Sequence, residues 1–263
     1  MRLLALTILP LMFATMLQAA VQSKVIEYKQ GDQVLEGFLA WDDALSPEPP
    51  RRPGVLVVHD WTGPGEYTRM RARKLAELGY IAFAADIYGK GIRPATPQKA
   101  GAQAGIYKKD PQLMRQRVQA GLDVLRAQPR CDPKRVAAIG YCFGGTCVLE
   151  LARNGADVVG VVSFHGGLST KTPDDAKNIR GKVLVLHGGD DPFVTPQEVA
   201  AFEDEMRAAG VDWQVVVYGG AVHSFSNPSS GNDKSRGAAY NAAADQRSWE
   251  AMKAFFKEVF QGG

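Results

Sequence analysis

Six short apolar runs without polar alternation are spaced along the chain from residue 55 onward. They occupy residues 55–58, 81–85, 136–139, 158–162, 183–186 and 213–218. A strand with one solvent face alternates apolar and polar residues, whereas a strand covered on both faces is apolar throughout. The runs therefore predict an α/β fold with a doubly wound, mostly parallel sheet and helices on both faces.

Amphipathic segments separate these runs, as the connections of a parallel sheet require. We expect helices at residues 66–78, 111–127, 143–153, 196–209 and 246–260. A hairpin near residues 25–39 and a polar, proline-rich connection at 46–53 precede the first apolar run. Residues 91–110 have mixed polarity and several glycines, which fits either a surface crossover or a cap over a substrate.

The amount of apolar sequence fits one large domain over residues 21–263. The chain has 263 residues, of which 45% are hydrophobic and 22% charged, enough for a single core. The net charge of +3 comes from interspersed basic and acidic residues, which argues against a nucleic-acid partner.

Residues 1–20 have the pattern of a secretory signal peptide. Arg2 precedes an apolar run over residues 3–17, and the small residues Ala19 and Ala20 follow it. The run is short for a membrane span, although an uncleaved anchor stays an alternative. We therefore expect a periplasmic or secreted protein that begins near Val21 and has no membrane contact in its mature form.

The sequence Gly-Tyr-Cys-Phe-Gly at residues 140–144 lies between an apolar run and a predicted helix. This Gly-x-nucleophile-x-Gly pattern is typical of a nucleophile elbow, a tight turn that only small neighbours permit. It makes Cys142 the candidate nucleophile and the Phe143 N–H, at the helix N-terminus, a candidate oxyanion donor. The alternative is that Cys142 is a small buried hydrophobe beside a glycine-rich turn.

An acid and a base follow in the order that an α/β-hydrolase triad requires. Asp191 lies just after the run at 183–186, and His223 lies in the loop after the run at 213–218. The imidazole would take the cysteine proton, and the carboxylate would fix its tautomer. Asp190 is the competing acid, but we favour Asp191 because Pro192 follows it and restricts the turn.

Three further histidines follow apolar runs and are expected at the carboxyl edge of the sheet, where ligands bind in this architecture. They are His59, His165 and His187. We expect His165 to line the substrate pocket and His187 to be structural. No histidine pair has a short metal-ligand spacing, so we expect neither a metal nor a cofactor.

The motifs together resemble those of the dienelactone hydrolase family, within the α/β-hydrolase superfamily. The resemblance covers most of residues 24–260 and rests on the elbow, on His-Gly-Gly-Asp-Asp-Pro-Phe-Val at 187–194, on His-Ser-Phe at 223–225 and on Val-Val-His-Asp-Trp-Thr-Gly at 57–63. It implies that Asp60 lies near the nucleophile and modulates it, in place of the usual glutamate. The alternative for Asp60 is a carboxylate at a helix N-terminus or one that orders its loop. The resemblance also implies that the Trp61 N–H completes the oxyanion hole.

The resemblance also suggests where substrate binds. Lys90 and Asn227 occupy positions at which dienelactone-specific members use arginines to bind a carboxylate. Lysine keeps a point charge without the bidentate fork of arginine, and asparagine is uncharged. Tyr88 and Trp249, like Trp61, are expected to be pocket walls.

Three cysteines leave at least one free thiol. We expect Cys142 to be free, whereas Cys131 and Cys147 fit either a disulfide or two reduced, buried thiols.

These inferences predict a Cys-His-Asp hydrolase that cleaves a small-molecule carboxylic ester or lactone. A thioesterase or esterase for small acyl groups is an alternative. From another class, the chain could be a redox-responsive ligand-binding protein that kept the fold without turnover.

Overall fold

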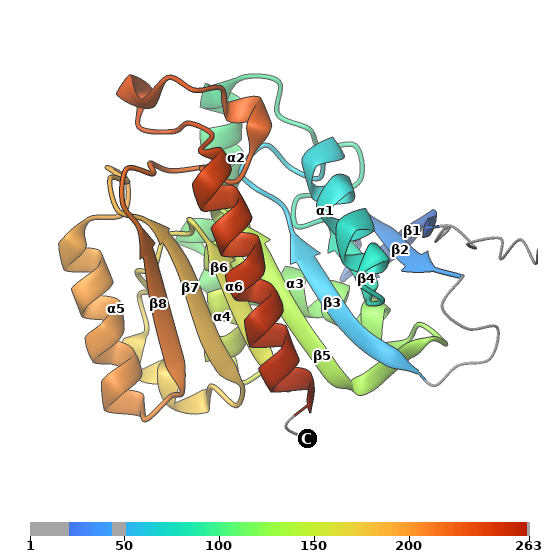
Figure 1. The fold of residues 1–263 in the computed structure, drawn as a ribbon. Coiled ribbons are helices and arrows are strands. Elements are labelled where there is room, and N and C mark those ends of the chain that lie inside the picture. Colours follow the sequence, from blue (N-terminus) through green and yellow to red (C-terminus); the bar gives the residue numbers. More distant parts are fainter. Residues whose placement is uncertain (1–20, 44–50, 262–263) are drawn as a thin grey trace, which may run out of the picture.

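The computed structural model describes residues 21–43 and 51–261, so the predicted signal peptide lies outside the described residues. The described chain forms one eight-stranded sheet with the strand order β1-β2-β4-β3-β5-β6-β7-β8 (Figure 1). This order, with its helices, is that of an α/β-hydrolase fold, as the sequence predicts.

The first two strands form the expected hairpin at one edge of the sheet. Strands β1 (Val21–Gln30) and β2 (Gln33–Asp42) pair antiparallel, and β2 pairs antiparallel with β4. All later pairings are parallel. The remaining strands are β3 (Arg52–Val58), β4 (Ile81–Ala85), β5 (Cys131–Tyr141), β6 (Gly160–Phe164), β7 (Lys182–Gly188) and β8 (Trp213–Tyr218).

Each central strand sends alternate side chains to opposite faces of the sheet. In β3, Leu56 and Val58 join the core beneath α3 (Pro111–Arg126), α4 (Phe143–Arg153) and α5 (Pro196–Ala209). Val55 and Val57 join the other core, beneath α1 (Glu66–Glu77) and α6 (Ala242–Gln261). Figure 1 shows α6 in front of the sheet and α3 and α4 behind it. Both faces are thus buried, which explains the unalternated apolar runs.

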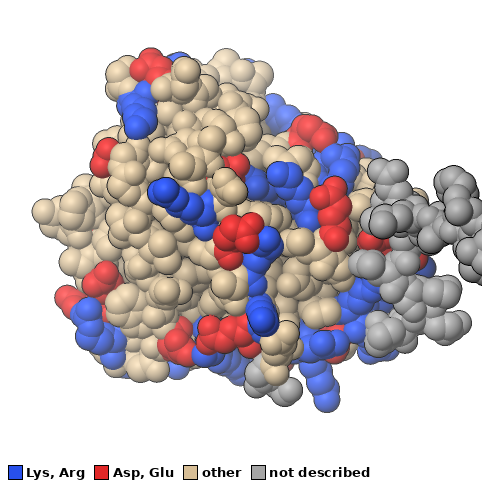
Figure 2. Space-filling view, in the orientation of Figure 1, with Lys and Arg blue, Asp and Glu red and all other residues tan. Residues whose placement is uncertain are grey.

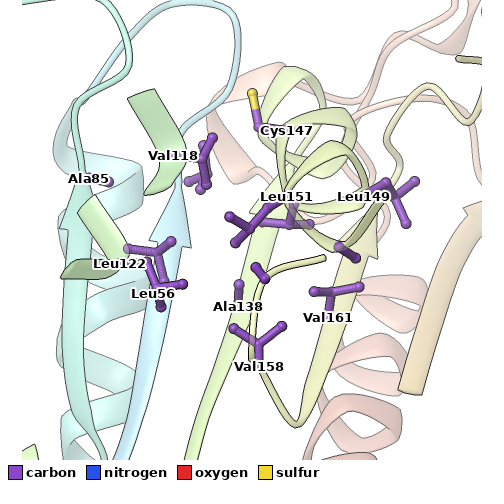
Figure 3. Packing of buried hydrophobic residues seen from close by; sticks show 14 of the residues in the cluster. Leu56, Ala85, Val118, Leu122, Ala138, Cys147, Leu149, Leu151, Val158 and Val161 are labelled. Carbon is purple, nitrogen blue, oxygen red and sulfur yellow. The ribbon is translucent and has the colours of Figure 1, made fainter. Parts of the chain in front are cut away.

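The spacing of apolar residues along α3 shows how this helix covers the sheet. Val118, Leu122 and Leu125 recur at intervals of four and three residues, and all are fully buried. Leu151 of α4 belongs to the same cluster as Ala138 of β5 (Figure 3). The close packing holds the start of α4, where the elbow lies, against the sheet.

Residues 91–110 contain a helix that the sequence reasoning missed, α2 (Pro97–Lys109). Thr96 caps it by accepting the Lys99 N–H at 3.3 Å. Its inward positions include the small residues Ala100 and Ala104, which give a weak apolar stripe. This explains why periodicity alone did not reveal the helix. Short 3₁₀ turns also occur at η1 (Pro173–Asn178), η2 (Pro228–Ser230) and η3 (Lys234–Arg236).

Charged side chains of both signs are interspersed over the face of the molecule drawn in Figure 2. This view shows no large patch of one sign, in keeping with the small net charge. Among the helices that the structure describes, none is long and apolar enough to cross a membrane.

Candidate active site

The nucleophile elbow joins β5 to α4 through a strained residue. Cys142 has φ 55° and ψ −114°, a backbone conformation that non-glycine residues rarely adopt. A Cβ on Gly140 would lie 1.9 Å from the Gly144 carbonyl oxygen, and a Cβ on Gly144 would lie 2.3 Å from the Val58 oxygen. Both contacts are with backbone, which cannot rotate away. The glycines therefore allow the close approach that presents Cys142 at the sheet edge.

The structure brings Cys142, His223 and Asp191 together from three loops. His223 Nε2 lies 3.0 Å from Cys142 Sγ, and His223 Nδ1 lies 2.7 Å from Asp191 Oδ2. The other Asp191 oxygen accepts the Phe193 N–H at 2.8 Å, which holds the carboxylate in place. Asp190, the competing acid, is exposed. The geometry thus favours Asp191 as the partner of the imidazole.

Charge determines the protonation of His223. Burial by itself lowers its pKa, but the Cys142 sulfur and the Asp191 carboxylate outweigh burial and raise the pKa to about 10. The site therefore stabilises the state in which the cysteine proton has passed from the sulfur to the imidazole.

Two loops meet beside the nucleophile because their strands are neighbours. Val58, near the end of β3, pairs with Gly140 of β5, so the segment with Trp61 follows β3 at the same edge as the elbow. Phe143 is the first residue of α4, where backbone N–H groups have no partner within the helix. Such N–H groups at a helix N-terminus favour negative charge. The topology therefore places both predicted oxyanion residues at this edge.

Tyr88 is a buried residue that contacts both segments, the one with Trp61 and the one with Phe143. It is 1% exposed, and its hydroxyl donates to the Trp61 carbonyl at 2.9 Å. Its ring centroid lies 5.5 Å from that of Phe143. Tyr88 is thus placed where it can position the Trp61 backbone.

Asp60 orders its own loop. Its carboxylate accepts hydrogen bonds from the Thr62 N–H at 2.8 Å and from the Thr62 hydroxyl at 2.5 Å. These bonds match the loop-ordering alternative stated for Asp60, and the structure describes no hydrogen bond from its carboxylate to Cys142.

The other predicted substrate residues have partners elsewhere. Lys90 forms an ion pair with Glu27 of β1. Asn227 accepts the Ser229 N–H at 3.0 Å and so caps η2. Trp249 packs against the buried guanidinium of Arg71 at 5.2 Å.

His165 lies behind the elbow rather than open to solvent. It is 1% exposed, and its Nδ1 accepts the Cys142 N–H at 3.2 Å. Burial, aided by nearby His223, holds its pKa well below the ordinary value, so the ring is neutral. His187 is also buried.

Phe193 is a site residue that the sequence reasoning missed. The residue is 59% exposed, and its ring stands edge-on to the His223 ring, with centroids 5.4 Å apart. Its position two residues after the predicted acid, Asp191, is the sequence feature that could have indicated a place in the site. Trp61 is also partly exposed, at 38%. These two exposed aromatic residues belong to segments that carry the candidate site.

The cysteines outside the candidate site are free thiols. Cys131 and Cys147 are both buried and form no disulfide. Burial raises the pKa of Cys131 to about 11 and that of Cys147 well above its ordinary value, so both thiols are neutral. Within the described ranges, no cluster of three or more His, Cys, Asp or Glu side chains is arranged to hold a metal ion.

The strand order, the elbow and the adjacent histidine define a protein of the α/β-hydrolase class. The chain belongs to the dienelactone hydrolase family, whose sequence profile matches residues 43–260.

Individual relatives agree with this assignment. The crystal structure of a dienelactone hydrolase-like promiscuous phosphotriesterase from metagenomic libraries is 42% identical, with a TM-score of 0.87, and the match covers 92% of this chain and 99% of that one. An Aquifex aeolicus protein, whose name gives carboxymethylenebutenolidase as its proposed activity, is 28% identical over 89% of this chain and 97% of its own. A dienelactone hydrolase structure from Anabaena variabilis shares the fold at 20% identity, with a TM-score of 0.62, covering 89% of this chain and 98% of that one.

Proposed function

We propose that this hydrolase cleaves carboxylic esters or lactones through a covalent intermediate on Cys142. The observation that carries the proposal is the continuous contact from the Cys142 sulfur through the His223 ring to the Asp191 carboxylate, at 3.0 and 2.7 Å. These distances lie within the reach that nucleophile, base and orienting acid require.

The proposed reaction has two halves. In the first, the Cys142 sulfur forms a bond to the substrate carbonyl carbon, and the N–H groups of Trp61 and Phe143 stabilise the negative oxygen. The carbonyl re-forms as the ester C–O bond breaks, and His223 gives its proton to the departing oxygen. In the second, His223 takes a proton from water, which attacks the thioester. The carboxylic acid leaves, and the sulfur regains its original state.

The surroundings of the site favour a substrate with a neutral, apolar part. Lys90 is paired with Glu27, and Asn227 carries no charge, so neither position offers the cation that a dienelactone carboxylate would use. Phe193 and Trp61 present exposed aromatic surface instead. We therefore expect simple aryl or alkyl esters to be better substrates than an anionic lactone.

Steady-state hydrolysis tests the proposal. The panel is p-nitrophenyl acetate and butyrate, a dienelactone, and a phosphotriester, since one structural relative is described as a phosphotriesterase. Turnover should disappear in Cys142→Ala and persist in the matched control Cys131→Ala, which removes a buried free thiol from the start of β5. Equal turnover by wild type and Cys142→Ala would refute the mechanism, and no turnover by wild type would favour the ligand-binding alternative.

We also propose that residues 1–20 direct export and are then removed. The support is the sequence pattern alone. Cell fractionation with N-terminal sequencing of the recovered protein should find a mature chain beginning near Val21. Recovery of the intact chain in the cytoplasm would contradict export.

A further inference from the structure

We propose that His165 is a positioning residue that ties the nucleophile elbow to the loop carrying His223. The proposal rests on the thiol mechanism above and concerns how its two reacting groups are held 3.0 Å apart.

The His165 ring bridges two segments that are far apart in the sequence. Its Nδ1 accepts the backbone N–H of Cys142 at 3.2 Å, an N–H that is shared with the Phe164 carbonyl at 3.0 Å. Its Nε2 lies 2.8 Å from the hydroxyl oxygen of Ser226. Because Nδ1 accepts an N–H, the ring proton is on Nε2 and is donated to Ser226. Ser226 lies three residues after His223. One neutral imidazole therefore fixes both the elbow and the histidine loop.

The Ser226 end of this bridge is itself anchored. Its hydroxyl lies 2.7 Å from the Tyr67 hydroxyl, and its carbonyl accepts from Arg71 at 2.7 Å. Arg71 forms an ion pair with Asp245 of α6. Tyr67 and Arg71 belong to α1, so the histidine loop is bonded directly to α1 and is connected to α6 through Arg71.

The bridge joins the strained parts of the backbone. In the part of the chain that the structure describes, the non-glycine residues with positive φ are Cys142, His165 and Ser224. Such conformations cost about 1–3 kcal/mol each and persist only where the surroundings impose them. The three lie on the segments that the bridge connects, and His165 and Ser226 are almost completely buried. The burial strengthens the demand for both hydrogen bonds.

The ring has a further constraint from its neighbours. Its centroid lies 5.3 Å from that of His223 and 5.0 Å from that of Phe225. A neutral ring can stand this close to protonated His223 without charge repulsion. His165 therefore supports the reacting pair by geometry and takes no part in proton transfer.

Three variants separate positioning from simple folding. His165→Phe keeps an aromatic ring but removes both hydrogen bonds. His165→Asn keeps a residue that tolerates positive φ, with an amide oxygen for the Cys142 N–H. Ser226→Ala removes the other end of the bridge. The matched control is Ser248→Ala, since Ser248 is a fully buried serine whose hydroxyl bonds within α6.

The readout is kcat per active site for p-nitrophenyl acetate, with active sites counted by iodoacetamide labelling of Cys142. We expect His165→Phe to lower kcat on the order of 10- to 100-fold, because small misplacements of reacting groups have effects of this size. KM should change less than twofold, and His165→Asn should recover part of the loss. Ser226→Ala should lower kcat in the same direction, and Ser248→Ala should leave it unchanged.

A kcat per labelled site within twofold of wild type in His165→Phe would overturn the proposal and leave the hydrolase mechanism intact. If wild type showed no Cys142-dependent turnover, the proposed function would fail, and the rate of Cys142 alkylation at pH 7 would test His165 independently. A slower rate in His165→Phe than in wild type would then support the bridge, and an equal rate would overturn it.

Discussion

Replacement of Asp191 by asparagine tests the electrostatic account of the site most directly. Despite burial, which opposes it, the pKa of His223 rises from 6.5 to about 10. At about 1.4 kcal/mol per pKa unit, the rise corresponds to roughly 5 kcal/mol in favour of the imidazolium. Cys142 and Asp191 share this effect. The His223–Asp191 contact at 2.7 Å is a charge-assisted hydrogen bond, so its loss costs roughly 2–3 kcal/mol.

This cost predicts a fall in kcat of roughly 30- to 150-fold for Asp191→Asn. A second effect adds to it, because an asparagine N–H facing His223 Nδ1 would move the ring proton to Nε2, toward the sulfur. The wrong tautomer lowers kcat by about 10⁴ in serine proteases, which sets the upper bound.

The assay is hydrolysis of p-nitrophenyl acetate, with thermal unfolding to verify that the variant is folded. Asp190→Asn is the matched control, because that carboxylate is adjacent in sequence but exposed, and kcat should stay within twofold. A loss below tenfold in Asp191→Asn, or an equal loss in Asp190→Asn, would refute the reasoning.

Three other predictions follow from packing, charge and hydrogen bonding. Gly144→Ala forces a Cβ to within 2.3 Å of a backbone atom and should lower the free energy of unfolding, measured in urea, by about 3 kcal/mol or more. The control Gly105→Ala, which lies in open space on α2, should raise it by about 1 kcal/mol. Equal effects of the two substitutions would contradict the clash. Because the folded pKa of His223 is raised, its proton stabilises the fold fully below pH 6.5, and this stability is lost as pH rises toward about 10. The stability difference between wild type and His223→Ala should therefore shrink over that range, and a constant difference would disprove the shift. Tyr88→Phe removes the hydrogen bond to the Trp61 carbonyl, which contributes about 1 kcal/mol, and should lower kcat about fivefold with KM unchanged. A rise in KM alone would indicate that Tyr88 contacts the substrate instead.

Local patterns in the sequence predicted most of the elements. The apolar runs predicted strands β3 to β8, because a strand that is buried on both faces has apolar side chains at successive positions. The run predicted at residues 158–162 is shifted by two residues, since β6 spans Gly160–Phe164. The missed helix α2 buries small side chains, so its apolar stripe is too weak to recognise.

The sequence by itself determined the elbow and the family. Backbone atoms approach residues 140 and 144 so closely that only glycine fits, so the spacing of these glycines around Cys142 is enough to predict the turn. The order of the nucleophile, acid and base along the chain is also a property of sequence.

Only the tertiary structure decided which side chains meet. Strand order brings the loops after β5, β7 and β8 to one edge of the sheet, and the contact at 2.7 Å then distinguishes Asp191 from its neighbour Asp190. The same packing pairs Lys90 with Glu27 and places His165 between Cys142 and Ser226. These contacts join residues that are far apart in sequence, and their formation depends on the closure of the whole sheet, so no local pattern can encode them.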